Sequence, residues 1–333
     1  MWPDSRRRGV AGRGPGWGRW DVPADGHPPT TERALITSRV PRPSHAWRAI
    51  AVPFTVLLLW DVLVTVLYHA GARGFTGIDI QFTLFGTAIA LFTGFMVNAA
   101  YQRWWEARTL WGQVVNSSRS LAREALVLLD ERGEGARPGL GPQVVRAQVA
   151  YVHLLRTALR GQPVPDEARA HLDDAVREGV ERSTNRPNAV LTHVGRLLAE
   201  AAHRGVLSDY RRVQMEATLV VLTDAQGGLE RIKNTPLPVQ YRFLPRFFAQ
   251  VFGAILPFAV VNDLGWATPI GSGLVGLMFL LAVQIGDELA EPFADAVYDV
   301  PMTALTRTIE IDLVEMIGAE PPSALRPVDR VLW

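Results

Sequence analysis

Two stretches of the sequence contain no charged residue over the length that a helix needs to cross a lipid bilayer, and this feature restricts the fold more than any other. They run from Gln81 to Tyr101 and from Leu264 to Gly286. The hydrocarbon core of a bilayer is crossed by about 20 predominantly apolar residues in helical form. Both stretches therefore predict transmembrane helices.

Two further apolar stretches complete a pattern of paired spans. Ala49 to Ala70 is interrupted by Asp61, and Phe243 to Val261 carries Arg246 near its start. The chain as a whole is 48% hydrophobic and 20% charged, too apolar for an ordinary soluble protein and too charged to lie entirely in a membrane. We therefore predict two membrane hairpins on either side of a polar, Arg-rich domain.

Lysine and arginine are unevenly distributed along the chain. Nine precede the first span, one (Arg73) follows it, twenty-one lie from Arg103 to Arg246, none separates spans three and four, and three follow. Because cytoplasmic loops of membrane proteins carry excess positive charge, both termini and the central region are expected in the cytoplasm. The loops "GARGFTGID" and "NDLGWA" are expected outside.

The polar region between the hairpins shows helical spacing of apolar residues and lacks period-two strand patterns, so it is predicted to be all-α. Helices are expected at about 102–130, 144–161, 165–180, 188–204 and 208–233. No proline or turn signal separates the second span from "RWWEAR", so one long helix should leave the membrane and enter the bundle. Trp104 and Trp105 are expected at the membrane interface.

These signals divide the chain into five expected parts. They are a disordered Arg/Gly/Pro-rich tail (1–45), a first transmembrane hairpin (46–101), a cytoplasmic helical domain (102–235), a second hairpin (236–290) and a C-terminal cytoplasmic helix and tail (291–333). Arginines of the tail could contact nucleic acid or anionic lipid. The alternatives are a solvated tail or a misassigned start codon, and no nucleic-acid partner is expected.

Several classes of catalytic and cofactor site are excluded or unsupported. The chain has no cysteine and a single lysine, Lys233, so thiolate sites and phosphate-binding G-x-x-x-x-G-K-[ST] loops are excluded. The histidines at 153, 171, 193 and 203 lack metal-ligand spacing and are expected to be packing or surface residues. We expect no catalysis, no cofactor and no metal.

Two features inside the spans have competing interpretations. A carboxylate deep in a span, as at Asp61, indicates either an ion path or a polar contact that orients the first span. The run "GSGLVG" (271–276) superficially resembles a phosphate loop, but it lies inside an apolar span with no preceding strand. Close packing of helices through small residues explains it better.

The second span carries two adjacent stripes of residues four apart, which share a face of a helix. Gly86, Ala90 and Gly94 form a small-residue stripe that allows another helix to approach closely. The adjacent stripe is Thr87, Leu91 and Phe95. By composition alone these three would face lipid or pack internally, but several copies of the helix around an axis would make them a narrow apolar neck.

Three segments together resemble the bestrophin family in its bacterial branch. They are "GTAIALFTGFMVNAAYQRWWEARTLWG", "ERIKNTPLPVQYRFLPRFF" and "DELAEPFADAVYDVPMTALTRTIEIDL", and the likeness extends in consistent order over about 46–318. The resemblance implies a homopentameric ion channel whose five second helices surround one pore. It also implies no enzyme activity, with the subunit itself, small inorganic ions and the lipid bilayer as partners.

Residue by residue, the resemblance assigns candidate roles along the conduction path. Thr87, Leu91 and Phe95 match the pore neck, with Thr87 where an aliphatic residue is usual. Tyr210 in "LSDYRR" matches a second, cytoplasmic constriction, again with a bulkier residue than usual. The expected vestibule residues are Asp79, Asn98, Gln102 and Arg103.

The chain departs from the calcium-gated animal members after the fourth span. Those members carry a dense acidic run at this point, whereas "EPFADAVYDVP" has only Asp295 and Asp299. Two carboxylates provide too few oxygen ligands for a dedicated calcium cage, so we expect no calcium gating.

The combined interpretation is a multi-pass channel of the bacterial inner membrane that passively conducts small ions, chiefly chloride and other monovalent anions. A monovalent-cation channel of the same fold is the alternative, because Asp79 near the outer mouth favours cations. A secondary transporter would usually show an internal repeat, which is not evident here. A non-conducting membrane scaffold is the remaining alternative, and the gating stimulus is not indicated.

Overall fold

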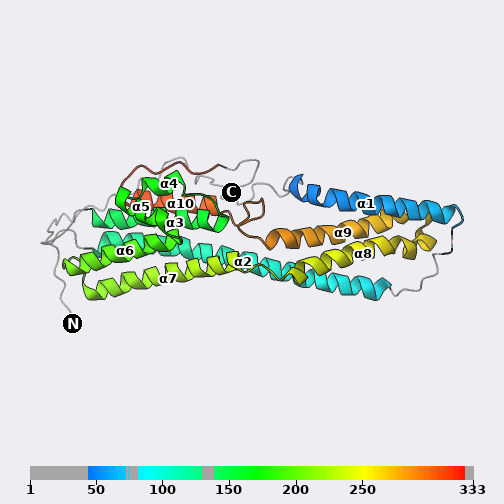
Figure 1. Ribbon diagram of the computed structural model, residues 1–333, viewed down its shortest axis with the longest axis horizontal. Coiled ribbons are helices and arrows are strands. Elements are labelled where there is room, and N and C mark those ends of the chain that lie inside the picture. Colours follow the sequence, from blue (N-terminus) through cyan, green and yellow to red (C-terminus); the bar gives the residue numbers. More distant parts are fainter. Residues whose placement is uncertain (1–43, 73, 75–81, 130–138, 327–333) are drawn as a thin grey trace, which may run out of the picture. The chain divides into compact units, whose positions relative to one another are not determined.

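The computed structural model describes residues 44–72, 74, 82–129 and 139–326, which belong to one compact unit within Leu35–Trp333. Every element in these residues is helical, which confirms the all-α prediction (Figure 1). The α-helices are α1 (Ser44–His69), α2 (Phe82–Leu128), α3 (Leu140–Arg160), α4 (Asp166–Ala170), α5 (Asp174–Arg182), α6 (Arg186–His203), α7 (Asp209–Asn234), α8 (Val239–Leu264), α9 (Thr268–Leu289) and α10 (Met302–Met316). A short 3-10 turn, η1 (Gly265–Ala267), joins α8 to α9. Residues 1–43 of the expected N-terminal tail lie outside the described residues, and its last two residues already belong to α1.

Helix α2 joins the two halves of this unit. It is 47 residues long, about 70 Å at 1.5 Å per residue, and contains no proline. It passes without interruption through "RWWEAR", as the sequence predicts. Its first half packs against α8 and α9 and its second half against α3, α7 and α10. We call α1, α8, α9 and the first half of α2 the apolar hairpins. We call α3 to α7, α10 and the second half of α2 the polar bundle.

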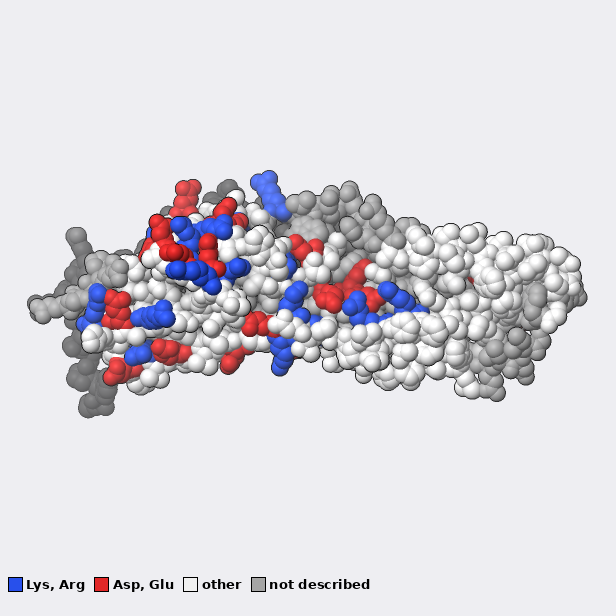
Figure 2. Space-filling model, in the orientation of Figure 1, with Lys and Arg blue, Asp and Glu red and all other residues white. Residues whose placement is uncertain are grey.

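Three helical stretches are long and apolar enough to cross a membrane: Ala49–His69, Phe82–Leu128 and Val239–Leu289. The third contains two helices, because η1 reverses the chain and α8 and α9 pack side by side (Figure 1). The visible face of the apolar hairpins has few charged atoms, whereas arginine and acidic residues cover the polar bundle (Figure 2). The protein is therefore an all-helical membrane protein.

Small residues let the helices of the apolar hairpins approach one another. A Cβ atom added at Gly273 of α9 would lie 3.3 Å from Cδ1 of Leu58 in α1. A Cβ atom added at Gly286 would lie 2.8 Å from Cε of Met96 in α2. The Gly273 contact agrees with helix packing, rather than phosphate binding, as the role of "GSGLVG".

Asp61 cross-links α1 to α9. Its side chain is buried, and its Oδ2 atom accepts a hydrogen bond of 2.6 Å from the hydroxyl of Ser272. The same hydroxyl lies 2.7 Å from the carbonyl of Thr268. Of the two interpretations of Asp61, the structure therefore supplies the polar contact that orients the first span.

The polar bundle has a continuous core around α3, in which Trp111 of α2 and Tyr151 of α3 are completely buried. The single helix expected at 165–180 is interrupted, because Asp173 adopts an extended backbone that separates α4 from α5. The interruption places His171 beside α10, with its Nε2 atom 3.5 Å from a carboxylate oxygen of Glu310.

Candidate pore-lining face

Helix α2 has a packed side and an open side within the apolar hairpins. Ile89, Thr93 and Met96 are buried, and the first and last of these join small apolar clusters with residues of α8 and α9. Leu91 and Phe95 are each 56% exposed, and their neighbours Leu84 and Phe92 are exposed as well. The expected neck residues thus have no apolar partner within the subunit that would bury them.

The remaining expected residues of the open side are polar. Thr87 is exposed and donates its hydroxyl to the carbonyl of Thr83 at 2.7 Å. Asn98 and Gln102 are exposed one and two turns beyond Phe95. The open side of α2 therefore changes from apolar to polar along its length.

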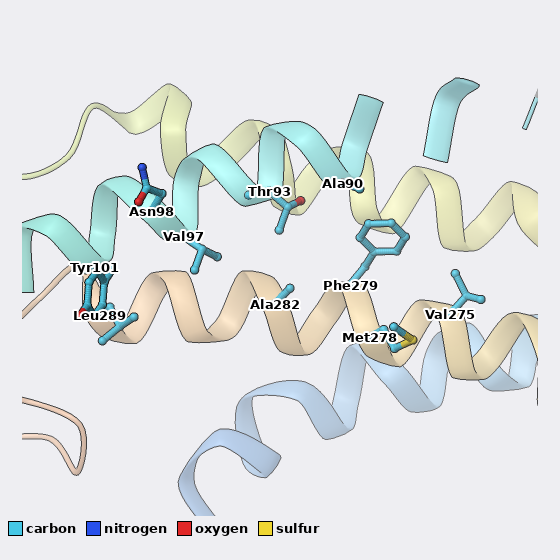
Figure 3. A pocket seen from close by; sticks show the side chains of 11 residues that line it. Ala90, Thr93, Val97, Asn98, Tyr101, Val275, Met278, Phe279, Ala282 and Leu289 are labelled. Atoms are coloured by element: carbon cyan, nitrogen blue, oxygen red, sulfur yellow. The ribbon is translucent and has the colours of Figure 1, made fainter. Parts of the chain in front are cut away.

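An apolar groove of about 710 Å³ runs beside this open side, between α2 and α9 (Figure 3). Val97 of α2 and Ala282 of α9 point toward each other across it, while Tyr101 and Leu289 lie together at one end. Asn98 lies at its edge and points away from α9. A Cβ atom added at Gly94 would meet no atom within 4 Å, so the groove is open at that position.

The small-residue stripe of α2 therefore has two surroundings. A Cβ atom added at Gly86 would lie 3.3 Å from the ring of Phe252 in α8, so this glycine permits packing within the subunit. Ala90 and Gly94 instead line the groove. Only the second part of the stripe remains available to another molecule.

Arg103, expected in the vestibule, is held by three backbone carbonyl groups. Its Nε atom donates to Ala290 at 2.8 Å, its Nη1 to Thr235 at 2.5 Å, and its Nη2 to Ile232. The acceptors lie at or near the C-terminal ends of α9 and α7, where carbonyl groups lack partners within the helix. Arg103 therefore joins three helices and is not free to move with passing ions.

Tyr210 and Asp79 complete the expected set. Tyr210 lies in the first turn of α7, and its side chain is 88% exposed. Such exposure of a large aromatic ring is unusual for a residue of the polar bundle and leaves the ring available to a cavity or a partner. Asp79 lies outside the described residues.

Sequence reasoning missed one charged pair on the open side of α2. Glu106 and Arg231 of α7 form an exposed ion pair between the Oε1 and Nη2 atoms. Glu106 follows Phe95 by eleven residues, which is about three helical turns, so the two share a face of α2. That spacing is the signal in the sequence that could have found it, although the partner could not be read from it.

The described residues offer no cluster of three metal-ligating side chains. His153 is buried and has a packing role, since its Nε2 atom lies 3.2 Å from Oε2 of Glu310. Burial alone would raise the pKa of Glu310, but hydrogen bonds from His153 and His171 and the charge of Arg307 hold it at about 2. The polar bundle is thus stabilised by a cluster of charged and polar groups around Glu310.

The fold and this face define a class of protein: an all-helical membrane protein in which one long helix presents an exposed apolar-to-polar stripe. A family model described as Bacterial/Fungal Bestrophin protein matches residues 35–315. The chain belongs to the bestrophin family, so it is a membrane channel-family protein and not an enzyme, as the sequence predicts.

Similar proteins cover most of the chain. The "voltage-dependent anion channel-forming protein YneE" of Salmonella typhi is 36% identical over 265 residues, 78% of this chain and 85% of the relative. The YneE protein of Escherichia coli strain K12 is 35% identical over 276 residues, 81% of this chain and 89% of the relative. A crystal structure of a bacterial bestrophin homologue from Klebsiella pneumoniae superimposes with a TM-score of 0.75 at 30% identity, covering 82% of this chain and 100% of the homologue.

Proposed function

We propose that this chain forms an anion channel of the bacterial inner membrane, with the open side of α2 lining the conduction path. The observation that carries the proposal is that Leu91 and Phe95 are exposed on the side of α2 away from the buried residues that pack against α8 and α9. Relatives that cover four fifths of the chain are named anion channel-forming proteins, which supports anions as the conducted ions.

The path requires several subunits, because one copy of α2 encloses no pore. Five copies around an axis would bring Thr87, Leu91 and Phe95 into a narrow neck, with Asn98 and Gln102 below it and Tyr210 at a second constriction. An apolar neck limits conduction because an ion there loses water without gaining polar partners. The groove beside Ala90 and Gly94 would receive an adjacent subunit in such a pentamer.

The polar bundle would lie in the cytoplasm together with both termini. This orientation places the arginine-rich segments inside and the η1 turn outside, as the positive-inside rule requires. The cytoplasmic membrane surface would lie near the ends of α8 and α9 that adjoin the polar bundle. Arg242 and Arg246 support this placement, because both form ion pairs with Asp287 there.

Ion flux from proteoliposomes containing the purified full chain tests the proposal. We expect chloride efflux that exceeds sodium efflux under matched gradients, and a pentamer by native mass spectrometry in detergent. Sodium flux with no chloride flux would establish the cation alternative. Absence of both fluxes from a correctly assembled oligomer would contradict a channel function.

A further inference from the structure

We propose that the ion pair between Glu106 and Arg231 determines the charge selectivity of the cytoplasmic vestibule. This inference rests on the proposed channel function and extends it to a pair of residues that the family resemblance did not assign. In the described part of the open side of α2, Glu106 is the first ionised group beyond the neck after the polar residues Asn98 and Gln102.

The position of Glu106 follows from the helix geometry. Eleven residues from Phe95 advance the chain by about three turns and about 16 Å along the axis. Because α2 is continuous over this distance, the carboxylate lies on the same side as the neck. An ion leaving the neck along α2 therefore passes two polar side chains before it reaches this charge.

Arg231 brings the opposite charge from the neighbouring helix. It lies in the last turn of α7, three heptads after Tyr210, so the two residues lie within about 60° of each other around α7. Its side chain is 66% exposed and that of Glu106 is 46% exposed. Both charges therefore remain in contact with water, as groups that interact with passing ions must be.

Arg103 is the nearest alternative source of positive charge, but its guanidinium group is held by hydrogen bonds within the subunit. All three of its guanidinium nitrogens donate to the carbonyl groups at the ends of α7 and α9. Glu106 and Arg231 instead pair directly with each other, although the charge of Glu106 also acts on Arg103. Removing one partner should leave five uncompensated charges of one sign around the vestibule of a pentamer.

The sign of the effect differs for the two residues. Glu106→Gln leaves Arg231 unopposed and should raise the anion-to-cation permeability ratio, whereas Arg231→Gln leaves Glu106 unopposed and should lower it. Salt screens the fields of exposed charges over about 8 Å at physiological ionic strength, so the shifts in permeability ratio should be largest at low salt. There we expect changes of about threefold or more. The double variant should return close to the ratio of the unmodified protein.

Reversal potentials of the reconstituted full-length channel under a potassium chloride gradient provide the test. The pair is exposed and contributes little to stability, so both single variants should assemble normally. Asp174→Asn and Arg177→Gln are matched controls, since they break an exposed ion pair on α5 away from α2, and their permeability ratios should not change. Opposite shifts for Glu106→Gln and Arg231→Gln, cancelled in the double variant, establish the proposal.

Failure of the ion-pair proposal and failure of the channel function would give different results. Normal flux with unchanged or same-direction shifts in both single variants would overturn the role of the pair and leave the channel function standing. No flux from the unmodified, correctly assembled protein would contradict the proposed function itself.

Discussion

The guanidinium of Arg160 lies 2.7 Å from a carboxylate oxygen of Asp295, in the segment that connects α9 to α10. Asp295 has a left-handed backbone with φ of 69°, which is uncommon for a residue other than glycine. Arg160 also donates to the hydroxyl of Thr303 at 2.7 Å, and its side chain is 6% exposed. The positively charged side chain of Arg160 thus holds the connecting segment to α3.

Calcium is expected to have no effect on conduction. Arg160 already neutralises Asp295, and a carboxylate oxygen of Asp299 accepts the backbone N–H of Ala296 at 2.9 Å. Few oxygen atoms then remain for a cation that needs 6–8 of them. Flux measured with added calcium and with a chelator should be equal, and activation by calcium would show that this segment binds the ion despite Arg160.

Stability should depend on the ionisation of Asp299. Burial raises the pKa of this carboxyl to about 6, against hydrogen bonds from the backbone N–H groups of Ala296 and Asp295 and the charge of Arg160, which lower it. Between the unfolded pKa of about 3.8 and about 6, the folded state holds a proton that the unfolded state has lost, so stability falls as pH rises through this window.

Asp299→Asn replaces the carboxyl by a group that stays neutral. The variant should be more stable than the unmodified protein at pH 7, by about 1 kcal/mol after allowance for solvent screening, with a flatter stability profile between pH 4 and 6. Thermal unfolding in detergent across this range measures both quantities. Parallel profiles for the variant and the unmodified protein would contradict the assignment of the titration to Asp299.

Asp61 should be replaceable by asparagine without loss of conduction. The amide oxygen of Asn can accept the Ser272 hydroxyl as the carboxylate does, whereas leucine leaves that buried hydroxyl with only the Thr268 carbonyl. Asp61→Asn should therefore keep normal flux, and Asp61→Leu should lower the yield of assembled protein. A marked change of flux or selectivity in Asp61→Asn, with normal assembly, would instead indicate an ion path.

Arg103→Lys separates a structural role from an electrostatic one. Lysine keeps the positive charge but cannot donate in three directions fixed by a planar group, so the carbonyls of Ala290, Thr235 and Ile232 would lose partners. We expect a loss of about 1–3 kcal/mol in unfolding free energy with little change in ion selectivity. Unchanged stability combined with altered ion selectivity would contradict this structural role and support the vestibule role expected from the sequence.

The sequence predicts the membrane elements well because hydropathy and helical period are local properties. The charge-free run from Gln81 and the absence of proline through Arg103 are sufficient to predict α2 as one helix. The interruption at Asp173 is not predictable from the apolar spacing, because that spacing continues across the gap between α4 and α5.

The roles of charged side chains depend on partners far away in sequence, and prediction fails there. The carbonyls that hold Arg103 come from residues 129, 132 and 187 positions away. The partner of Glu106 is 125 positions away, so neither the pair nor its exposure follows from a local pattern. Leu91 and Phe95 were predicted from residue spacing together with the family resemblance, and their place in a pore is still a prediction.

The central claim is that the open side of α2 lines the pore, and chloride flux through a variant of the neck residues tests it most directly. Chloride flux should be measured on Leu91→Ala/Phe95→Ala in the same preparation that is checked for pentamer, with Leu59→Ala of α1 as a control for truncating an exposed apolar residue of another span. Because Leu91 and Phe95 are exposed in the subunit, their truncation should leave the pentamer intact and wet the constriction, which raises flux severalfold with little change in anion preference. Buried packing residues would instead cost about 2–5 kcal/mol each and reduce assembly. Unchanged flux through an intact pentamer of the double variant would contradict the assignment of this face to the pore.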